Sequence, residues 1–94
     1  MKHARKDYDR IQDPEGLIPE DEPVFLLRGQ DAFAPELLLR WSHKLRLVGG
    51  DPKMARMVED HAQAMIAYQR EKKRIKIPDL PDGYFPEDSE VEKG

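Results

Sequence analysis

The stretch Val48-Gly49-Gly50-Asp51-Pro52 decides the fold, because it ends one helix and begins another. Glycine readily adopts the left-handed conformation that closes many helices, so Gly49 and Gly50 predict a helix C-terminus. Asp51 offers a side-chain oxygen to the free amides of a following helix, and Pro52 suits the first position of that helix. A connection this short between two helices favours an antiparallel hairpin.

Apolar residues recur at helical spacing on both sides of this junction. The first helix is predicted over residues 32–49, with Asp31 as its cap and Pro35 in its first turn. The second is predicted over residues 51–74, because Pro78 prevents much further extension. The expected apolar stripe of the first helix comprises Leu38, Trp41, Leu45 and Val48, widened by Leu37 and Leu39. The expected seam of the second helix comprises Met54, Val58, His61, Met65 and Tyr68.

The flanking segments lack this periodicity. We expect a mobile arm over residues 1–12, a loop with a short strand over 13–31, and an extended acidic tail over 75–94. The apolar run Val24–Leu27 is typical of a buried strand, and its backbone needs a partner, either residues 75–77 or a second copy of the chain. The fold class is therefore mainly α: one small domain with an antiparallel helical hairpin, a short N-terminal extended strand and extended, partly disordered termini.

The hairpin is small for an independent domain. A core of this size stabilises a chain only marginally, since ordering the backbone costs about 1–2 kcal/mol per residue. The sequence therefore predicts a homo-oligomer, a dimer or higher, with the seam of the second helix as its interface. The alternative is a compact monomer whose termini wrap around the hairpin.

Composition excludes several classes of protein. Charged residues make up 37% of the 94 residues, yet the net charge is only −3, so neither a generally polybasic nucleic-acid binder nor a strongly acidic mimic of nucleic acid is expected. The chain has no cysteine and no apolar run of about 18 residues, so we expect no thiolate metal site and no membrane span. A protein of the cytoplasm follows as the expectation.

No constellation of residues indicates catalysis. The three histidines, His3, His43 and His61, have no co-ligands at metal-binding spacing. Ser42 neighbours His43, but adjacent side chains on a helix diverge. Phosphate-binding glycine motifs are absent from the sequence. We expect no enzyme activity, no catalytic residues, no metal and no cofactor.

Two polar groups are candidates for binding. Residues 70–76 carry five cations in seven residues, which either complement the helix dipole or bind an anion together with Arg40 and a stacking face on Trp41. The turn before the first helix carries Arg28, Gln30 and Asp31, which either satisfy loop and helix ends or bind an anionic ligand at a helix N-terminus. The candidate ligand or partner residues are Arg28, Gln30, Asp31, Arg40, Trp41, Lys72, Lys73 and Arg74.

One pattern resembles a known family. The pattern is Phe25-x-Leu27-Arg28-x-Gln30-Asp31-x-x-Ala34-Pro35, followed by Trp41, His61-Ala62 and Met65. It is similar to a small family associated with bacteriophage and prophage genomes, over about residues 14–68. The resemblance implies a phage-borne accessory protein and carries no catalytic residues with it.

Three hypotheses of function follow. The first is a non-enzymatic accessory protein that binds a host protein through an oligomeric helical surface. The second is a sponge that sequesters a nucleotide signal at subunit interfaces and so blocks host anti-phage defence. The third is weak nucleic-acid binding through the basic run.

Overall fold

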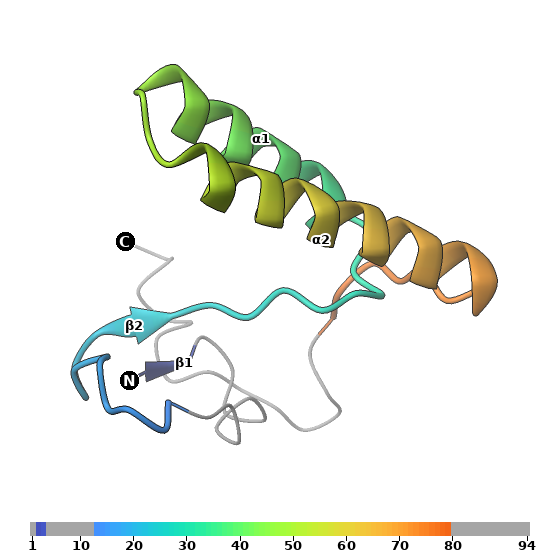
Figure 1. The fold of residues 1–94 in the computed structure, drawn as a ribbon. Helices are drawn as coiled ribbons and strands as arrows, with labels where there is room; N and C mark the ends of the chain where they lie inside the picture. Colours follow the sequence, from blue (N-terminus) through green and yellow to red (C-terminus); the bar gives the residue numbers. More distant parts are fainter. Residues whose placement is uncertain (1, 4–12, 80–94) are drawn as a thin grey trace, which may run out of the picture. The chain divides into compact units, whose positions relative to one another are not determined.

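The computed structural model describes residues 2–3 and 13–79, and the chain divides into two units. Residues 27–79 contain two helices, α1 (Ala34–Leu47) and α2 (Pro52–Glu71), which lie side by side and run in opposite directions (Figure 1). The expected helical hairpin is therefore confirmed. No helix in the described part of the chain is long and apolar enough to cross a membrane.

The junction between the helices forms as its residues predict. Gly49 has a φ of +74° and donates its amide to the carbonyl of Arg46, while Gly50 donates to Leu45. These two bonds form the Schellman arrangement that satisfies the last carbonyls of a helix. The Asp51 carboxylate then accepts the amide of Lys53 at 2.9 Å, which caps α2.

Helix α1 begins two residues later than the predicted residue 32. Phe33 occupies its N-cap position and makes no side-chain cap bond, and Pro35 lies in the first turn as expected. The Asp31 carboxylate accepts the amide of Phe33 at 2.8 Å, so it stabilises the turn that precedes the helix. Asp31 thus acts as a local turn acceptor rather than as the cap itself.

Helix α2 ends at Glu71, three residues before the predicted end. Lys73 adopts a left-handed φ of +51°, and the amide of Arg74 returns to the carbonyl of Gln69 at 3.0 Å. This reversal brings Lys76 beside the turn before α1, where its amide donates to Gln30 and its carbonyl accepts from Ala32. Tertiary pairing has therefore replaced the last predicted turn.

A short strand does form in the segment before the hairpin, but it covers Pro23–Val24 rather than residues 24–27, and its partner is neither of the two that were considered. The second unit includes residues 2–3 and 13–26, and in it β2 (Pro23–Val24) pairs in parallel with β1 (Lys2–His3). Residues 75–77 meet the turn at Asp31 instead. Phe25 is 70% exposed, so the apolar run is not a buried strand. Part of the expected mobile arm is thus a paired strand, whereas residues 4–12 and the tail beyond residue 79 lie outside the described residues.

The turn at the start of the described loop agrees with its sequence. Gly16 has a φ of +63° and donates its amide to the carbonyl of Asp13. The Asp13 carboxylate also accepts the amides of Leu17 and Ile18. An aspartate that bonds the backbone ahead of it in this way fixes a turn without tertiary support.

Small side chains form the contact between the helices. The fully buried residues are Ala34 on α1 and Ala55 and Ala62 on α2, joined by Ser42 and Met65. The predicted stripe of α1 is therefore rotated: Trp41 is 49% and Val48 is 81% exposed, whereas Ser42 is buried. Small residues at a helix contact permit a short interaxial distance, which explains why the large side chains lie elsewhere.

The two left-handed residues give a matched test of stability. Gly49→Ala should destabilise the protein by about 1 kcal/mol, because a Cβ strains a left-handed backbone. Nothing lies within 4 Å of that Cβ, so the cost is conformational and not steric. Lys73→Gly should stabilise the protein by about 0.5 kcal/mol. The substitution relieves the strain of a left-handed backbone, and the larger conformational entropy that glycine has in the unfolded chain offsets part of this gain. Thermal unfolding measures both, and equal signs for the two variants would contradict the assignment.

Candidate protein-binding groove

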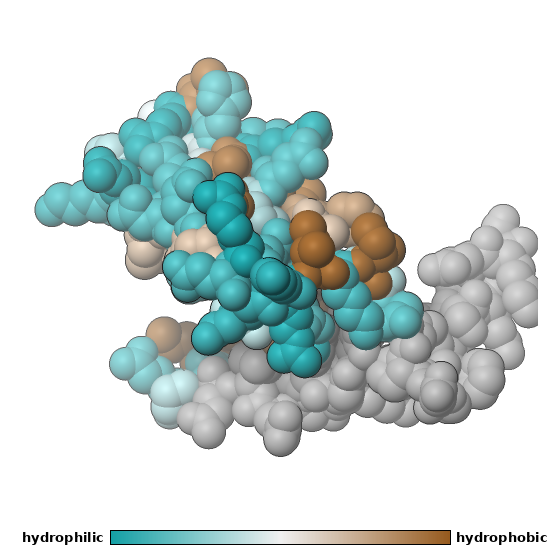
Figure 2. Space-filling view, turned by 90° about the vertical axis from the view of Figure 1, so that its right-hand side faces the viewer, coloured by the Kyte–Doolittle hydropathy of each residue, from teal (hydrophilic) through white to brown (hydrophobic). Residues whose placement is uncertain are grey.

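An apolar groove of about 630 Å³ runs along the hairpin. No charged side chain lines it, and its lining residues come from both helices and from the segment before α1: Leu27, Leu37, Leu38, Trp41, Met57, Val58 and His61. Figure 2 shows apolar side chains exposed among hydrophilic ones on one face of the structure. Trp41 and Met57 are 49% and 58% exposed, so the groove is open to a partner.

The two helices build the groove with the same spacing. Helix α1 contributes Leu37, its next residue and Trp41, and α2 contributes Met57, its next residue and His61. Residues at i, i+1 and i+4 share one side of a helix because each residue advances by about 100°. Each helix therefore presents one continuous apolar edge to the groove.

An ion pair flanks each of these edges. The Arg40 guanidinium lies 2.8 Å from Glu36 on α1, and the Arg56 guanidinium lies 3.3 Å from Asp60 on α2. All four side chains are at least two-thirds exposed, so these pairs contribute little to stability. The two pairs carry no net charge between them, and Lys44 adds a cation beside Arg40 and Trp41.

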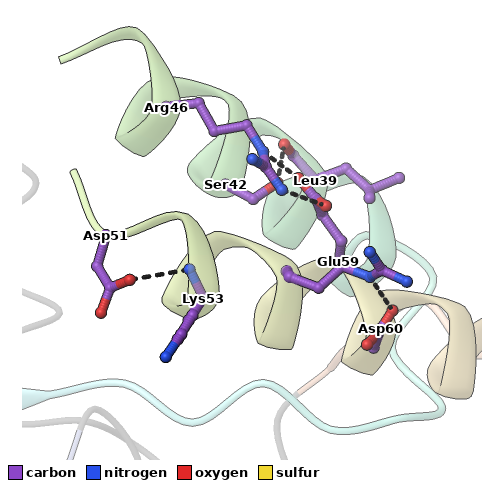
Figure 3. A network of polar contacts seen from close by, with 8 residues as sticks. Leu39, Ser42, Arg46, Asp51, Lys53, Glu59 and Asp60 are labelled. Carbon is purple, nitrogen blue, oxygen red and sulfur yellow. Dashed lines mark hydrogen bonds and ion pairs between the residues drawn. The ribbon is translucent and has the colours of Figure 1, made fainter. Parts of the chain in front are cut away.

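A third ion pair ties the two helices together (Figure 3). Arg46 donates from Nε and from one terminal nitrogen to the two carboxylate oxygens of Glu59, at 2.8 and 2.9 Å. Such a two-bond pair has a fixed geometry. The guanidinium, with help from the Ser42 hydroxyl, lowers the pKa of Glu59, and the carboxylate in turn raises the pKa of Arg46. The pair therefore fixes the register of α1 on α2.

A second hollow, of about 360 Å³, lies between α2 and the turn over residues 27–30. It brings together Arg28 and Gln30, which the sequence singled out, with His61 and Tyr68. Within residues 27–79 Arg28 forms no ion pair. His61 lines both hollows and is exposed, so it is not a core histidine.

Gln69 holds this turn on α2. Its side-chain nitrogen donates to the carbonyl oxygens of Gly29 at 3.0 Å and of Asp31 at 2.9 Å. A glutamine about forty residues away in the chain thus satisfies two carbonyls of this turn. Nothing in the local sequence indicates this role, because the partner positions are distant in the chain.

The basic run at the end of α2 lines neither the groove nor the second hollow. Lys72, Lys73 and Arg74 are exposed there. Arg40, expected as a neighbour of this run, is paired with Glu36 instead. Trp41 thus lines the groove without a cation, but it also lines a hollow of about 770 Å³ on α1 together with Arg40 and Lys44.

The predicted interface seam only borders the groove. Val58 and His61 line it, and Met65 and Tyr68 line the second hollow with His61. Met54 is 42% exposed and lines neither. Four groove residues are not among the predicted site residues: Leu27, Leu37, Leu38 and Met57. For the three that lie on the helices, the signal in the sequence is the repeated i, i+1, i+4 spacing.

The described residues offer little for catalysis. They contain no group of three metal-ligating side chains that could hold an ion. The Ser42 hydroxyl is buried and donates to the carbonyl of Leu39 at 2.8 Å (Figure 3), so it is not placed to attack a substrate. What the arrangement can do is bind an apolar surface.

Comparisons with protein-family models, with curated proteins and with solved structures found no match for this chain.

Gln69→Glu should destabilise the protein by about 1–3 kcal/mol at neutral pH, because a carboxylate cannot donate to the two carbonyls. Hydrogen exchange at Ala32 and at Lys76 should accelerate as the turn is released. The control is Gln63→Glu, which places the same charge on an exposed part of α2. If both variants lower the free energy of unfolding equally, the two hydrogen bonds from Gln69 do not stabilise the protein.

Glu59→Gln should lower stability at pH 7, with an effect that disappears in acid. The folded state holds the pKa of Glu59 below its ordinary value. The Arg46–Glu59 pair therefore stabilises the folded protein at a pH above the pKa of glutamate in the unfolded chain. This stabilisation is lost as the pH falls through the lower pKa of Glu59 in the folded protein. The control is Asp60→Asn, which removes an exposed pair and should change stability little at any pH. Denaturant midpoints between pH 7 and pH 3 measure the difference, and a constant gap between Glu59→Gln and the unaltered protein would contradict it.

Proposed function

We propose that this protein is a non-enzymatic interaction protein that self-associates through its apolar groove and acts, as an oligomer, on a host protein. The observation that carries the proposal is the exposure of large apolar side chains along one groove, while small residues occupy the contact between the helices. Contiguous apolar surface on a soluble chain is typical of protein–protein contact.

A second copy of the chain is the occupant that the groove fits best. The buried apolar core of the described residues consists of three alanines, a proline and one methionine, which is small for a hairpin of this length. Burial of each large groove side chain would contribute roughly 1.5–3 kcal/mol. The two exposed ion pairs beside the groove are each neutral, so they do not oppose the approach of a second copy.

The wider role rests on the sequence resemblance. A phage accessory protein without catalytic residues acts by occupying a surface of a host protein, and an assembled hairpin offers its outer helical faces for this purpose. Affinity capture with the assembled protein from a bacterial lysate, compared with a variant that does not assemble, tests whether one host protein depends on the oligomer.

A nucleotide-binding role is the second candidate, supported by the second hollow. There Arg28 supplies a cation without an ion pair in the described ranges, and Tyr68 supplies an aromatic face. A protein that sequesters nucleotides would copurify with material that absorbs near 260 nm. Loss of that material in Arg28→Ala would distinguish this role from a purely protein-binding one. Nucleic-acid binding by the basic run gains no support from the groove or the second hollow, because Lys72, Lys73 and Arg74 line neither.

Met57→Glu should weaken self-association on the order of a hundredfold, because it places a charge in an apolar interface. Leu47→Glu is the control: Leu47 is 71% exposed but lies outside the groove, and this variant should assemble normally. Sedimentation equilibrium measures assembly, circular dichroism checks that both variants stay helical, and the emission of the single Trp41 should shift to the blue on assembly. A protein that stays monomeric at all concentrations, or equal losses in both variants, would refute the groove as the interface.

A further inference from the structure

Among the described residues that line the groove, His61 alone can change its charge near neutral pH. The other lining side chains are apolar. A histidine ordinarily gains its proton near pH 6.5, so mild acid places a cation in this groove. The consequence for the interface between two copies rests on the proposed self-association.

The neighbours of His61 on α2 offer no negative charge to that cation. Side chains three or four residues away share its side of the helix, and they are Met57, Val58, Ala64 and Met65. Asp60 is adjacent in sequence and therefore lies about 100° around the helix. Its carboxylate is 3.3 Å from the Arg56 guanidinium, so it is already paired.

Helix α1 and the segment before it, which complete the groove, supply no carboxylate to its lining. They contribute Leu27, Leu37, Leu38 and Trp41. Glu36 lies beside the groove, but its carboxylate is 2.8 Å from the Arg40 guanidinium. Lys44, which shares the outer hollow of α1 with Trp41, adds a positive charge. Nothing in the lining of the groove therefore favours a protonated ring.

On its other side His61 faces the second hollow, where the charge is also positive. Arg28 is the one charged side chain among the described residues that line this hollow. Gln30 and Tyr68, which line it as well, are uncharged polar side chains. A guanidinium opposes the protonation of a histidine that shares its site.

Self-association through the groove would replace the water around this ring. In the uncovered groove His61 is exposed, so water solvates the protonated form. When two copies meet through the same surface, each covers the groove of the other with a lining that has no acidic side chain. Burial without a negative partner disfavours the charged form of histidine. The proton therefore has to leave before the groove is covered.

We propose that His61 makes self-association through the groove dependent on pH, so that the chain assembles at neutral pH and dissociates in mild acid. Each copy contributes one such ring, and a pair of chains therefore releases up to two protons on assembly. In the range where the uncovered histidine is protonated, the association constant should fall by up to about a hundredfold per pH unit. Covering the groove and neutralising His61 are thus one linked equilibrium.

Sedimentation equilibrium between pH 8 and pH 5.5 tests this proposal on the unaltered protein, His61→Gln and His43→Gln. Glutamine keeps a polar side chain but gains no proton. His43 is the matched control, because it is exposed on α1 and lines the outer hollow instead of the groove. The pKa of Glu59 lies below its ordinary value, so the Arg46–Glu59 pair persists over this range. Circular dichroism at each pH checks that the hairpin stays helical.

The unaltered protein and His43→Gln should lose at least about tenfold in association constant between pH 8 and pH 5.5, whereas His61→Gln should associate equally at both. An equal loss in His61→Gln, or no loss in the unaltered protein, would overturn the proposal and leave self-association intact. A protein that is monomeric at every pH would instead overturn the proposed function.

A second measurement needs no variant. Proton NMR follows the protonation of His61 in the unaltered protein, once in the assembled state and once after dilution to the monomer. The midpoint should lie at lower pH in the assembled state, because the covered groove excludes the charged ring. Equal midpoints in the two states would overturn the proposal even if His61→Gln fails to assemble.

Discussion

The close contact of small side chains between α1 and α2 is the constraint on which the rest of the structure depends. Ala55 and Ala62 on α2 are fully buried, and Ser42 on α1 has only 2% of its surface exposed. A helix contact made of such residues is short and leaves no room for large side chains. Leu37, Trp41 and Met57 are instead exposed, and together with other apolar residues they line a groove.

The polar contacts within residues 27–79 fix the positions of the two helices and of the turn before α1, and they do not add to the apolar core. The Arg46–Glu59 pair fixes how far the helices slide along each other, and Gln69 fixes the turn that leads into α1. Lys73 accepts a left-handed conformation so that Lys76 can bond to the backbone of that same turn. Polar contacts at three points thus hold the hairpin and its entry turn in one geometry, and the second hollow lies beside that turn.

The sequence predicted the features that depend on near neighbours. Gly49 and Asp51 act as expected, because each forms its bonds within a few residues of itself. The face of each helix was predicted less well. An apolar pattern selects the largest side chains, so it selected Trp41 and Val48, whereas the helices meet through alanine and serine.

Contacts between distant residues could not be predicted in this way. The partner of Gln69 is a turn about forty residues earlier, and neither sequence neighbourhood carries a sign of it. The same applies to the end of α2, where pairing of Lys76 outweighs one more helical turn. The groove could be predicted only in part. The sequence identifies its residues as apolar positions of the helices, but it does not show that they are exposed, because their exposure depends on the contact of small residues between the helices.

Folding and association of this chain are expected to be coupled by the same arrangement. A hairpin held by alanines buries little apolar area, so much of the stabilisation available to the chain lies in covering its groove. A partner that binds only the folded hairpin stabilises it by mass action, and when the partner is a second copy the apparent stability rises with protein concentration. The unfolding midpoint should therefore increase with concentration in the unaltered protein and stay constant in Met57→Glu. A midpoint independent of concentration in both would mean that the hairpin is stable without its groove being covered, and that the exposed leucines and Trp41 serve a partner other than the chain itself.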